Sequence, residues 1–209
     1  ILDSADQPAH DAFVEKKSEF IGDACHIDSL DEALAFVQMI RDQHPKARHV
    51  AYAAVCGGSD GRLAERMSDD GEPSGTAGKP ILDVLRANEM TDCVVAVTRY
   101  FGGILLGSGG LIRAYSSGAS IAVKVATKAK IVPCSEYQVT LDYSQLGSFQ
   151  NLLASVQGEQ ADAQYTDRIV LALSLIHIYE PTFESRVVET FNATVTPQKT
   201  GTSNRPVKM

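Results

Sequence analysis

Residues 92–130, DCVVAVTRYFGGILLGSGGLIRAYSSGASIAVKVATKAK, decide the fold of the first part of the chain. The run 92–101 is almost continuously apolar and rich in Val, which predicts a strand buried on both faces. A glycine-rich turn follows it, and residues 111–130 have the periodicity of an amphipathic helix. The basic end of that helix, Lys124 to Lys130, suits the negative pole of its dipole. The stretch therefore predicts a strand, a tight turn and a long helix in direct succession.

The sequence before this stretch predicts further elements of the same domain. Residues 16–27 favour a strand, and Ser29 with Glu32 forms a capping box for a helix that ends at Pro45. Next we expect a hairpin and a second helix: a strand at 48–58, a turn at 58–61, a strand at 62–68 and a helix at 79–89.

The pattern changes at Pro133, which predicts two domains, 1–133 and 134–209, and an α+β fold class. The second domain is predicted to contain a strand (136–143), a helix (145–157), two strands (161–166 and 168–178), a helix (181–191) and a strand (192–198). This β-α-β-β-α-β order is typical of a ferredoxin-like unit. The tail KTGTSNRPVKM (199–209) has no periodicity, and we expect it to be disordered.

Composition limits the possible functions. The chain has 209 residues, of which 44% are hydrophobic, as in an ordinary globular protein. Its net charge of −7 excludes a global basic field, so any nucleic acid would have to bind a local patch. The cysteines are scattered without a C-x-x-C pair, which favours reduced thiols and a cytoplasmic location: Cys25, Cys56, Cys93 and Cys134. No apolar run is long enough for a membrane helix.

The glycines between the buried strand and the helix suggest an anion site. They are Gly102, Gly103, Gly107, Gly109 and Gly110. A turn of this kind exposes backbone N–H groups at the positive end of a helix, and Arg99 and Arg113 would add charged contacts. The alternative is that the glycines only permit positive φ and close packing. Neither the Walker A motif nor the G-x-G-x-x-G fingerprint is present.

The loop SDDGEPSGTAGKP (68–80) combines acidic residues with Gly and Pro, which indicates an ordered turn. Asp69, Asp70 and Glu72 are of the type that ligates Mg²⁺ or Ca²⁺, but the calcium-loop pattern is absent. Ser74 and Thr76 have no visible base that would make them nucleophiles. We therefore expect no metal and no cofactor.

Two long motifs identify a family resemblance. DGEPSGTAGKPILDVL (70–85) followed by VVAVTRYFGGILLGSGGLIRAYSSGA (94–119) closely resembles the YigZ/IMPACT family, and KKSEFI (16–21) and HPKARHVAYA (44–53) match its pattern too. The resemblance implies a first domain with the fold of the second domain of ribosomal protein S5. It implies a second domain similar to one in translation elongation factor G, and a role in regulating translation.

Together, the motifs predict one cleft lined by the loops 68–80 and 102–110. The expected ligand- or anion-binding residues are Arg99, Gly102, Gly103, Gly107, Gly109, Gly110, Arg113, Ser74, Thr76 and Lys79. The expected cleft-lining residues are His49, Tyr52, Asp69, Asp70, Glu72, Tyr100 and Tyr115, whose tyrosines would stack on bases. The carboxylates would orient the arginines or bind sugar hydroxyls.

Two functions fit such a cleft. The first is a binding protein that contacts RNA, the ribosome or a translation factor. The alternative is an enzyme that acts on a small phosphorylated or nucleotide substrate. The binding hypothesis is favoured because no complete nucleophile–base pair is visible in the sequence.

Overall fold

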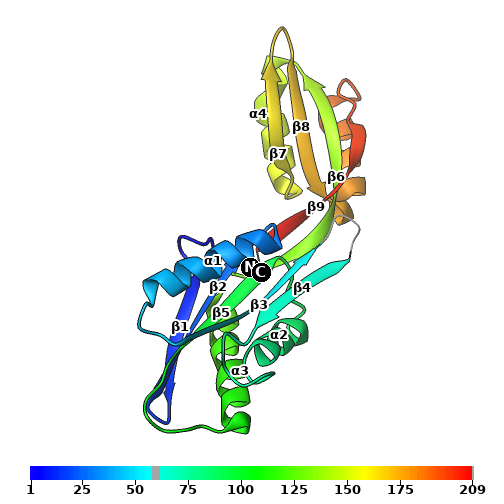
Figure 1. Ribbon diagram of the computed structural model, residues 1–209. Coiled ribbons are helices and arrows are strands. Elements are labelled where there is room, and N and C mark those ends of the chain that lie inside the picture. Colours follow the sequence, from blue (N-terminus) through cyan, green and yellow to red (C-terminus); the bar gives the residue numbers. More distant parts are fainter. Residues whose placement is uncertain (58–61, 209) are drawn as a thin grey trace. The chain divides into compact units, whose positions relative to one another are not determined.

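The computed structural model describes residues 1–57 and 62–208 (Figure 1). The chain divides into two compact units, Ile1–Ala129 and Lys130–Met209. Each unit contains one antiparallel sheet with helices packed on it, so the predicted mixed α and β fold class is confirmed. The predicted turn at 58–61 lies outside the described residues.

The first unit is built on a five-stranded sheet. Its order is β1 (Ala9–Glu15), β2 (Ser18–His26), β5 (Cys93–Tyr100), β3 (His49–Gly57) and β4 (Leu63–Ser68), and all neighbours are antiparallel. β1 was not predicted, because its polar and half-exposed side chains give only a weak pattern. β5 lies at the centre of the sheet, in agreement with its apolar sequence.

Three helices cover the two faces of this sheet (Figure 1). They are α1 (Leu30–Gln43), α2 (Gly78–Ala87) and α3 (Ser108–Val125). Side chains of β3 alternate between two cores: Tyr52 and Ala54 pack with residues of α1, whereas Ala53 and Val55 pack with residues of α2 and α3. The predicted cap of α1 is present, since the Ser29 side chain accepts a hydrogen bond from the Glu32 N–H.

A pair of glycines lets α3 approach the sheet closely. A Cβ atom at Gly22 of β2 would lie 2.3 Å from the carbonyl oxygen of Gly118 in α3. A Cβ atom at Gly118 would lie 2.8 Å from Val97 Cγ1 of β5. Both distances are shorter than a van der Waals contact, so any side chain here would push the helix away from the strands.

The second unit has the predicted ferredoxin-like topology. Its elements are β6 (Ala129–Leu141), the short 3₁₀ helix η1 (Tyr143–Gln145), α4 (Leu146–Ser155), β7 (Glu159–Tyr165), β8 (Ile169–Ile176), the 3₁₀ helix η2 (His177–Tyr179), α5 (Glu180–Phe191) and β9 (Gln198–Lys208). The sheet order is β7-β8-β6-β9, with the two sequence-distant strands β6 and β8 at the centre. Its core side chains come from the sheet and from both helices.

The structure corrects the prediction for the tail. Residues 199–208 are not disordered but belong to β9, which lies beside β6 at the edge of the sheet. Lys199 forms an ion pair with Glu180 (2.6 Å), and Arg205 forms one with Glu159 (2.8 Å). The strand carries polar side chains on both faces, so it lacks the apolar alternation by which strands are recognised.

Two further details differ from the predictions. Pro133 lies inside β6, and β6 already begins at Ala129. α3 ends at Val125, so Lys124 lies in its last turn whereas Lys128 and Lys130 lie beyond the helix. Among the described residues, no helix is long and apolar enough to cross a membrane.

Candidate functional site

The ends of several strands meet where the candidate residues lie. His49, at the start of β3, is paired with Arg99, at the end of β5. Ser68, at the end of β4, is opposite Tyr52 of β3, so the following loop, 69–77, begins at this same end of the sheet. The glycine-rich loop after β5 begins at this end as well, one residue beyond Tyr100.

A buried network joins loop 69–77 to the elements that flank the glycine-rich loop. Glu72 Oε1 accepts hydrogen bonds from Arg99 Nη1 (2.7 Å) and from the Tyr115 hydroxyl (2.8 Å). All three residues are buried. Burial, and then the Glu72 carboxylate, raise the pKa of Tyr115 well above its usual range, so the phenol stays protonated as a donor.

Arg99 is therefore neutralised inside the protein. Its guanidinium pairs with Glu72 and lies between the rings of Phe20 and Phe101, at 5.6 and 5.4 Å from their centroids. The sequence predicted Arg99 as a contact for a ligand anion. The structure instead places it in a buried ion pair that links loop 69–77 to β5, as expected for a carboxylate that orients an arginine.

Asp69 organises the acidic loop. Its carboxylate accepts hydrogen bonds from the backbone N–H groups of Gly75 (2.8 Å), Ala77 (2.9 Å) and Gly78 (2.8 Å). Burial alone would raise the pKa of Asp69, but these three donors outweigh it and lower the pKa. Asp69 thus closes the loop and fixes the start of α2.

Asp70 is also bound within the protein. Its carboxylate accepts hydrogen bonds from Arg41 (2.9 Å) and from the Val50 N–H (2.6 Å), and its carbonyl oxygen lies 2.8 Å from His49 Nδ1. Within residues 1–57 and 62–208, no group of three or more His, Cys, Asp or Glu is arranged to hold a metal ion. Asp69, Asp70 and Glu72 accept their hydrogen bonds from backbone N–H groups, from arginines and from the Tyr115 hydroxyl.

The other predicted residues of this loop are placed as follows. Thr76 Oγ1 donates a hydrogen bond to the Pro73 carbonyl (2.6 Å), and Lys79 pairs with Asp83 on the same helix (2.6 Å). Ser74 is exposed. None of the three lines the pocket described below.

The three tyrosines do not form a stacking platform. Tyr52 is buried in the core beneath α1, and Tyr115 is fully buried in the network with Glu72. Tyr100 is half-buried, and its hydroxyl lies 2.9 Å from His44 Nδ1. The expectation that these rings stack on bases is corrected for Tyr52 and Tyr115, because their faces are covered by protein.

The first backbone N–H groups of α3 have no side-chain acceptor among the described residues. Gly107 is the N-cap residue, with φ 71°, and as a glycine it has no side chain that could cap the helix. The first helical bond runs from the Leu111 N–H to the Gly107 carbonyl (2.9 Å). The preceding N–H groups, those of Ser108, Gly109 and Gly110, have no acceptor within the helix. They form the positive end of an 18-residue helix dipole.

The turn between β1 and β2 packs against the loop before α3. The Gly102 N–H donates to Ser18 Oγ (3.1 Å), and a Cβ atom at Gly102 would lie 1.9 Å from the Lys17 carbonyl oxygen. Only glycine permits this contact. It places Lys17 against the loop before α3, and Lys16 lines the same pocket as Gly110 and Arg113 of α3.

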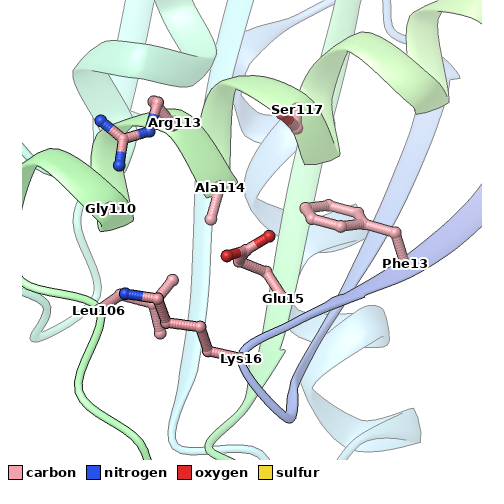
Figure 2. A pocket seen from close by; sticks show the side chains of 8 residues that line it. All are labelled: Phe13, Glu15, Lys16, Leu106, Gly110, Arg113, Ala114 and Ser117. Carbon is pink, nitrogen blue, oxygen red and sulfur yellow. The ribbon is translucent and has the colours of Figure 1, made fainter.

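A pocket of about 230 Å³ lies between this turn and α3 (Figure 2). It is lined by Phe13, Glu15, Lys16, Leu106, Gly110, Arg113, Ala114 and Ser117. Figure 2 shows the Lys16 side chain extending toward Leu106, the Glu15 carboxylate beneath Ala114, and Arg113 projecting from α3 near Gly110. Of the predicted site residues, the pocket contains Gly110 and Arg113. Sequence reasoning missed Phe13, Glu15 and Lys16, which come from the unpredicted strand β1 and the turn after it.

This part of the chain is locally basic. No acidic residue occurs between Asp92 and Glu136, although the whole chain has a net charge of −7. The cations of the segment are Arg99, which Glu72 neutralises, and Arg113, Lys124, Lys128 and Lys130. At the start of α3, Arg113 is therefore a cation without an acidic neighbour in the sequence.

A second polar cluster lies in the other unit, around Glu180. Its carboxylate accepts a hydrogen bond from Ser135 Oγ (2.9 Å) and lies 2.9 Å from His177 Nδ1. His177 falls inside the predicted strand 168–178, but it begins η2 instead and is largely exposed. Ser135 Oγ also lies 3.1 Å from His177 Nδ1, but Ser135 is fully buried, so the cluster does not supply an accessible nucleophile.

The comparisons with known proteins agree with the two-unit architecture. The family model of the Impact N-terminal domain matches residues 16–123, and the model "Domain of unknown function (DUF1949)" matches residues 139–194. The chain is 40% identical over 160 residues to "IMPACT family member YigZ" of Escherichia coli, covering 77% of this chain and 78% of that protein. It is 37% identical over 186 residues to an "IMPACT family member" of Haemophilus influenzae, covering 89% and 86%.

A solved structure, "Crystal structure of an hypothetical protein", is similar along most of the chain. It is 35% identical, has a TM-score of 0.59, and the match covers 91% of this chain and 92% of that one. Because the domain model covers residues 16–123 and the identity to curated relatives is high over most of their length, the chain belongs to the IMPACT family.

Proposed function

We propose that this IMPACT-family protein is a binding protein of the translation machinery, and that it contacts RNA phosphates in the pocket at the start of α3. One observation carries the proposal. Arg113 and Lys16 line the pocket beside the uncapped first turn of α3, and neither forms an ion pair within the described residues. The link to translation comes from the resemblance of the two domains to those of ribosomal protein S5 and elongation factor G.

The chemistry of the pocket suits a phosphate group. The N–H groups of the first turn and the helix dipole favour an anion there, and Arg113 is able to bind two phosphate oxygens at once. Glu15 lies in the same pocket and opposes a second nearby phosphate. We therefore expect few phosphate contacts, so that the affinity for single-stranded RNA falls with salt with a logarithmic slope of about −1.4, the value for two cations.

Binding is favoured over catalysis because the carboxylates and thiols that could take part in a reaction are already bound within the protein or buried. The carboxylates of the acidic loop are held by backbone N–H groups and arginines. All four cysteines are buried free thiols, and burial raises the pKa of Cys25 and of Cys93 to about 12. An enzyme acting on a phosphorylated substrate remains the alternative, and it would need a nucleophile from outside these groups.

The test is an RNA titration with a matched control. Fluorescence anisotropy is measured with a labelled 12-nucleotide single strand and a labelled RNA hairpin, and binding to purified bacterial ribosomes is followed by co-sedimentation. Arg113→Ala should weaken binding by about tenfold to a hundredfold, the equivalent of losing about 1.5–3 kcal/mol from a charged hydrogen bond.

Arg66→Ala is the control, because Arg66 is exposed on β4, at the opposite edge of the sheet from β1. It removes the same charge and should change neither affinity nor slope. Both variants should melt at the temperature of the unmodified protein. Equal affinities of Arg113→Ala and the unmodified protein for all three probes would show that the pocket does not bind RNA.

A further inference from the structure

Large apolar side chains are exposed around the start of α3. We call Phe101, Ile104, Leu105 and Ile112 the apolar loop; their exposed fractions are 48%, 41%, 82% and 42%. All four lie within twelve consecutive residues: Phe101, Ile104 and Leu105 in the loop after β5, and Ile112 in the first turns of α3. Exposed apolar groups of this kind mark interaction sites on proteins.

The loop is held in this exposed position at both ends. Gly102 is locked against the backbone of Lys17 and the hydroxyl of Ser18. Leu106 is buried in the core of the first unit and anchors the other end of the loop. The ring of Phe101 lies over the Arg99 guanidinium, which is itself fixed by Glu72. The apolar side chains are thus presented outward by a fixed backbone.

The charged residues that flank the apolar loop are mainly cations. Lys16 and Lys17 lie on the adjoining turn, and Arg113 follows Ile112; none of the three has an ion-pair partner in the described part of the chain. The loop and α3 contain no acidic residue. The neighbouring carboxylates, Glu15 and Glu19, belong to β1 and β2.

We propose that the apolar loop is a docking site for an acidic protein segment that carries apolar side chains. The unpaired cations complement acidic groups, and the exposed apolar side chains need apolar partners to leave water. The proposal goes beyond the phosphate site, since it rests on the apolar side chains. RNA fits them less well, because it offers no aliphatic surface that would cover Ile104 and Leu105.

One other occupant is disfavoured by charge. A second copy that met the first through the same loop would bring Lys16, Lys17 and Arg113 against their own equivalents. An acidic protein segment is the partner that satisfies both the apolar and the charged side chains.

The test selects partners by chemistry. A phage-displayed library of random 16-residue peptides is selected on the immobilised full chain and counter-selected on the Ile104→Ser/Leu105→Ser variant. We expect the enriched peptides to have a net negative charge and several apolar residues. A synthetic enriched peptide should lose at least tenfold in affinity to Ile104→Ser/Leu105→Ser and to Lys17→Glu.

The matched control is Ile178→Ser/Val188→Ser, which removes two comparably exposed apolar side chains (76% and 50%) from the second unit. It should bind the peptide with unchanged affinity, and all variants should melt as the unmodified protein does. RNA affinity should persist in Ile104→Ser/Leu105→Ser, so failure of this proposal is separable from failure of the phosphate site.

Three results would overturn the proposal. The first is a selection that enriches no peptides, or only basic or uncharged ones. The second is binding of the full chain to vesicles rich in phosphatidylserine that is lost in Ile104→Ser/Leu105→Ser, which would assign the loop to a lipid surface. The third is concentration-dependent self-association in sedimentation velocity that the same variant abolishes, which would assign it to a second copy.

Discussion

Replacing Glu72 with alanine would leave the Arg99 guanidinium buried without its counter-ion. Arg99 is 7% exposed, and its Nη1 lies 2.7 Å from Glu72 Oε1, so little water reaches the charge. Removing one partner of a buried ion pair typically costs about 3–5 kcal/mol. The Tyr115 hydroxyl would lose its acceptor at the same time. We expect the free energy of unfolding of the first unit to fall by about 4 kcal/mol.

The expected loss of stability can be measured by thermal unfolding and located by hydrogen–deuterium exchange. A loss of about 4 kcal/mol lowers the melting temperature by roughly 8–16 °C in a chain of this size. Circular dichroism gives the melting temperature. Hydrogen–deuterium exchange then locates the loss, because faster exchange should occur in the buried amides of β5 and not in the sheet of the second unit.

Two further variants separate charge from shape. Glu72→Gln keeps an oxygen acceptor but removes the charge. Its melting temperature should therefore lie between those of Glu72→Ala and the unmodified protein. Glu72→Met combined with Arg99→Met removes both charges and should recover most of the lost stability, as replacing a buried ion pair by apolar residues often does. The reasoning fails if Glu72→Ala melts within about 3 °C of the unmodified protein, or if the double variant is no more stable than Glu72→Ala.

Two other predictions concern packing and pH. Gly118→Val should destabilise the first unit by about 1–3 kcal/mol, because a Cβ atom at Gly118 already lies 2.8 Å from Val97 Cγ1. An unchanged midpoint of chemical denaturation would contradict the close approach of α3. In the second unit, the hydrogen bond from Lys199, with those from Tyr137 and Ser135, lowers the pKa of Glu180 from 4.5 to about 2. Because the folded-state pKa is lowered, the stability that Glu180 supplies is fully present above pH 4.5 and is lost toward pH 2. The stability difference between the unmodified protein and Glu180→Gln should shrink over that range, and a difference independent of pH would refute the assignment.

Helices and strands with a clear pattern of apolar residues were predictable from the sequence, whereas strands with a weak apolar pattern were not. β5 is buried on both faces, and its run of Val and Ala predicts this directly. β1 and β9 are edge strands with mostly exposed side chains, so no apolar alternation distinguishes them from loops. Edge strands depend on pairing with a neighbour that is distant in sequence, and a local pattern carries little of that information.

The same reason explains which site residues were predictable. Gly110 and Arg113 belong to a strand–turn–helix sequence whose chemistry is local, whereas Phe13 and Lys16 enter the pocket only because β1 pairs with β2. The burial of Arg99 could not be predicted from its neighbours in the sequence either. Arg99 lies near the end of the buried strand β5 and was predicted as an open cation, but Glu72, 27 residues earlier in the chain, neutralises it.

Arg99 and Arg113 differ in the contacts they make, and this difference separates their roles. Arg99 is bound from three sides, by Glu72, Phe20 and Phe101, so it holds the loops together and supplies no free charge. Arg113 lies one turn into α3 without a carboxylate partner in the described residues, in a segment that has no acidic residue from 93 to 135. An anion near the start of α3 therefore meets an uncompensated charge at Arg113 and a compensated one at Arg99. Under the proposed function, the buried ion pair holds loop 69–77 against β5, and the exposed Arg113 is the arginine available to a partner.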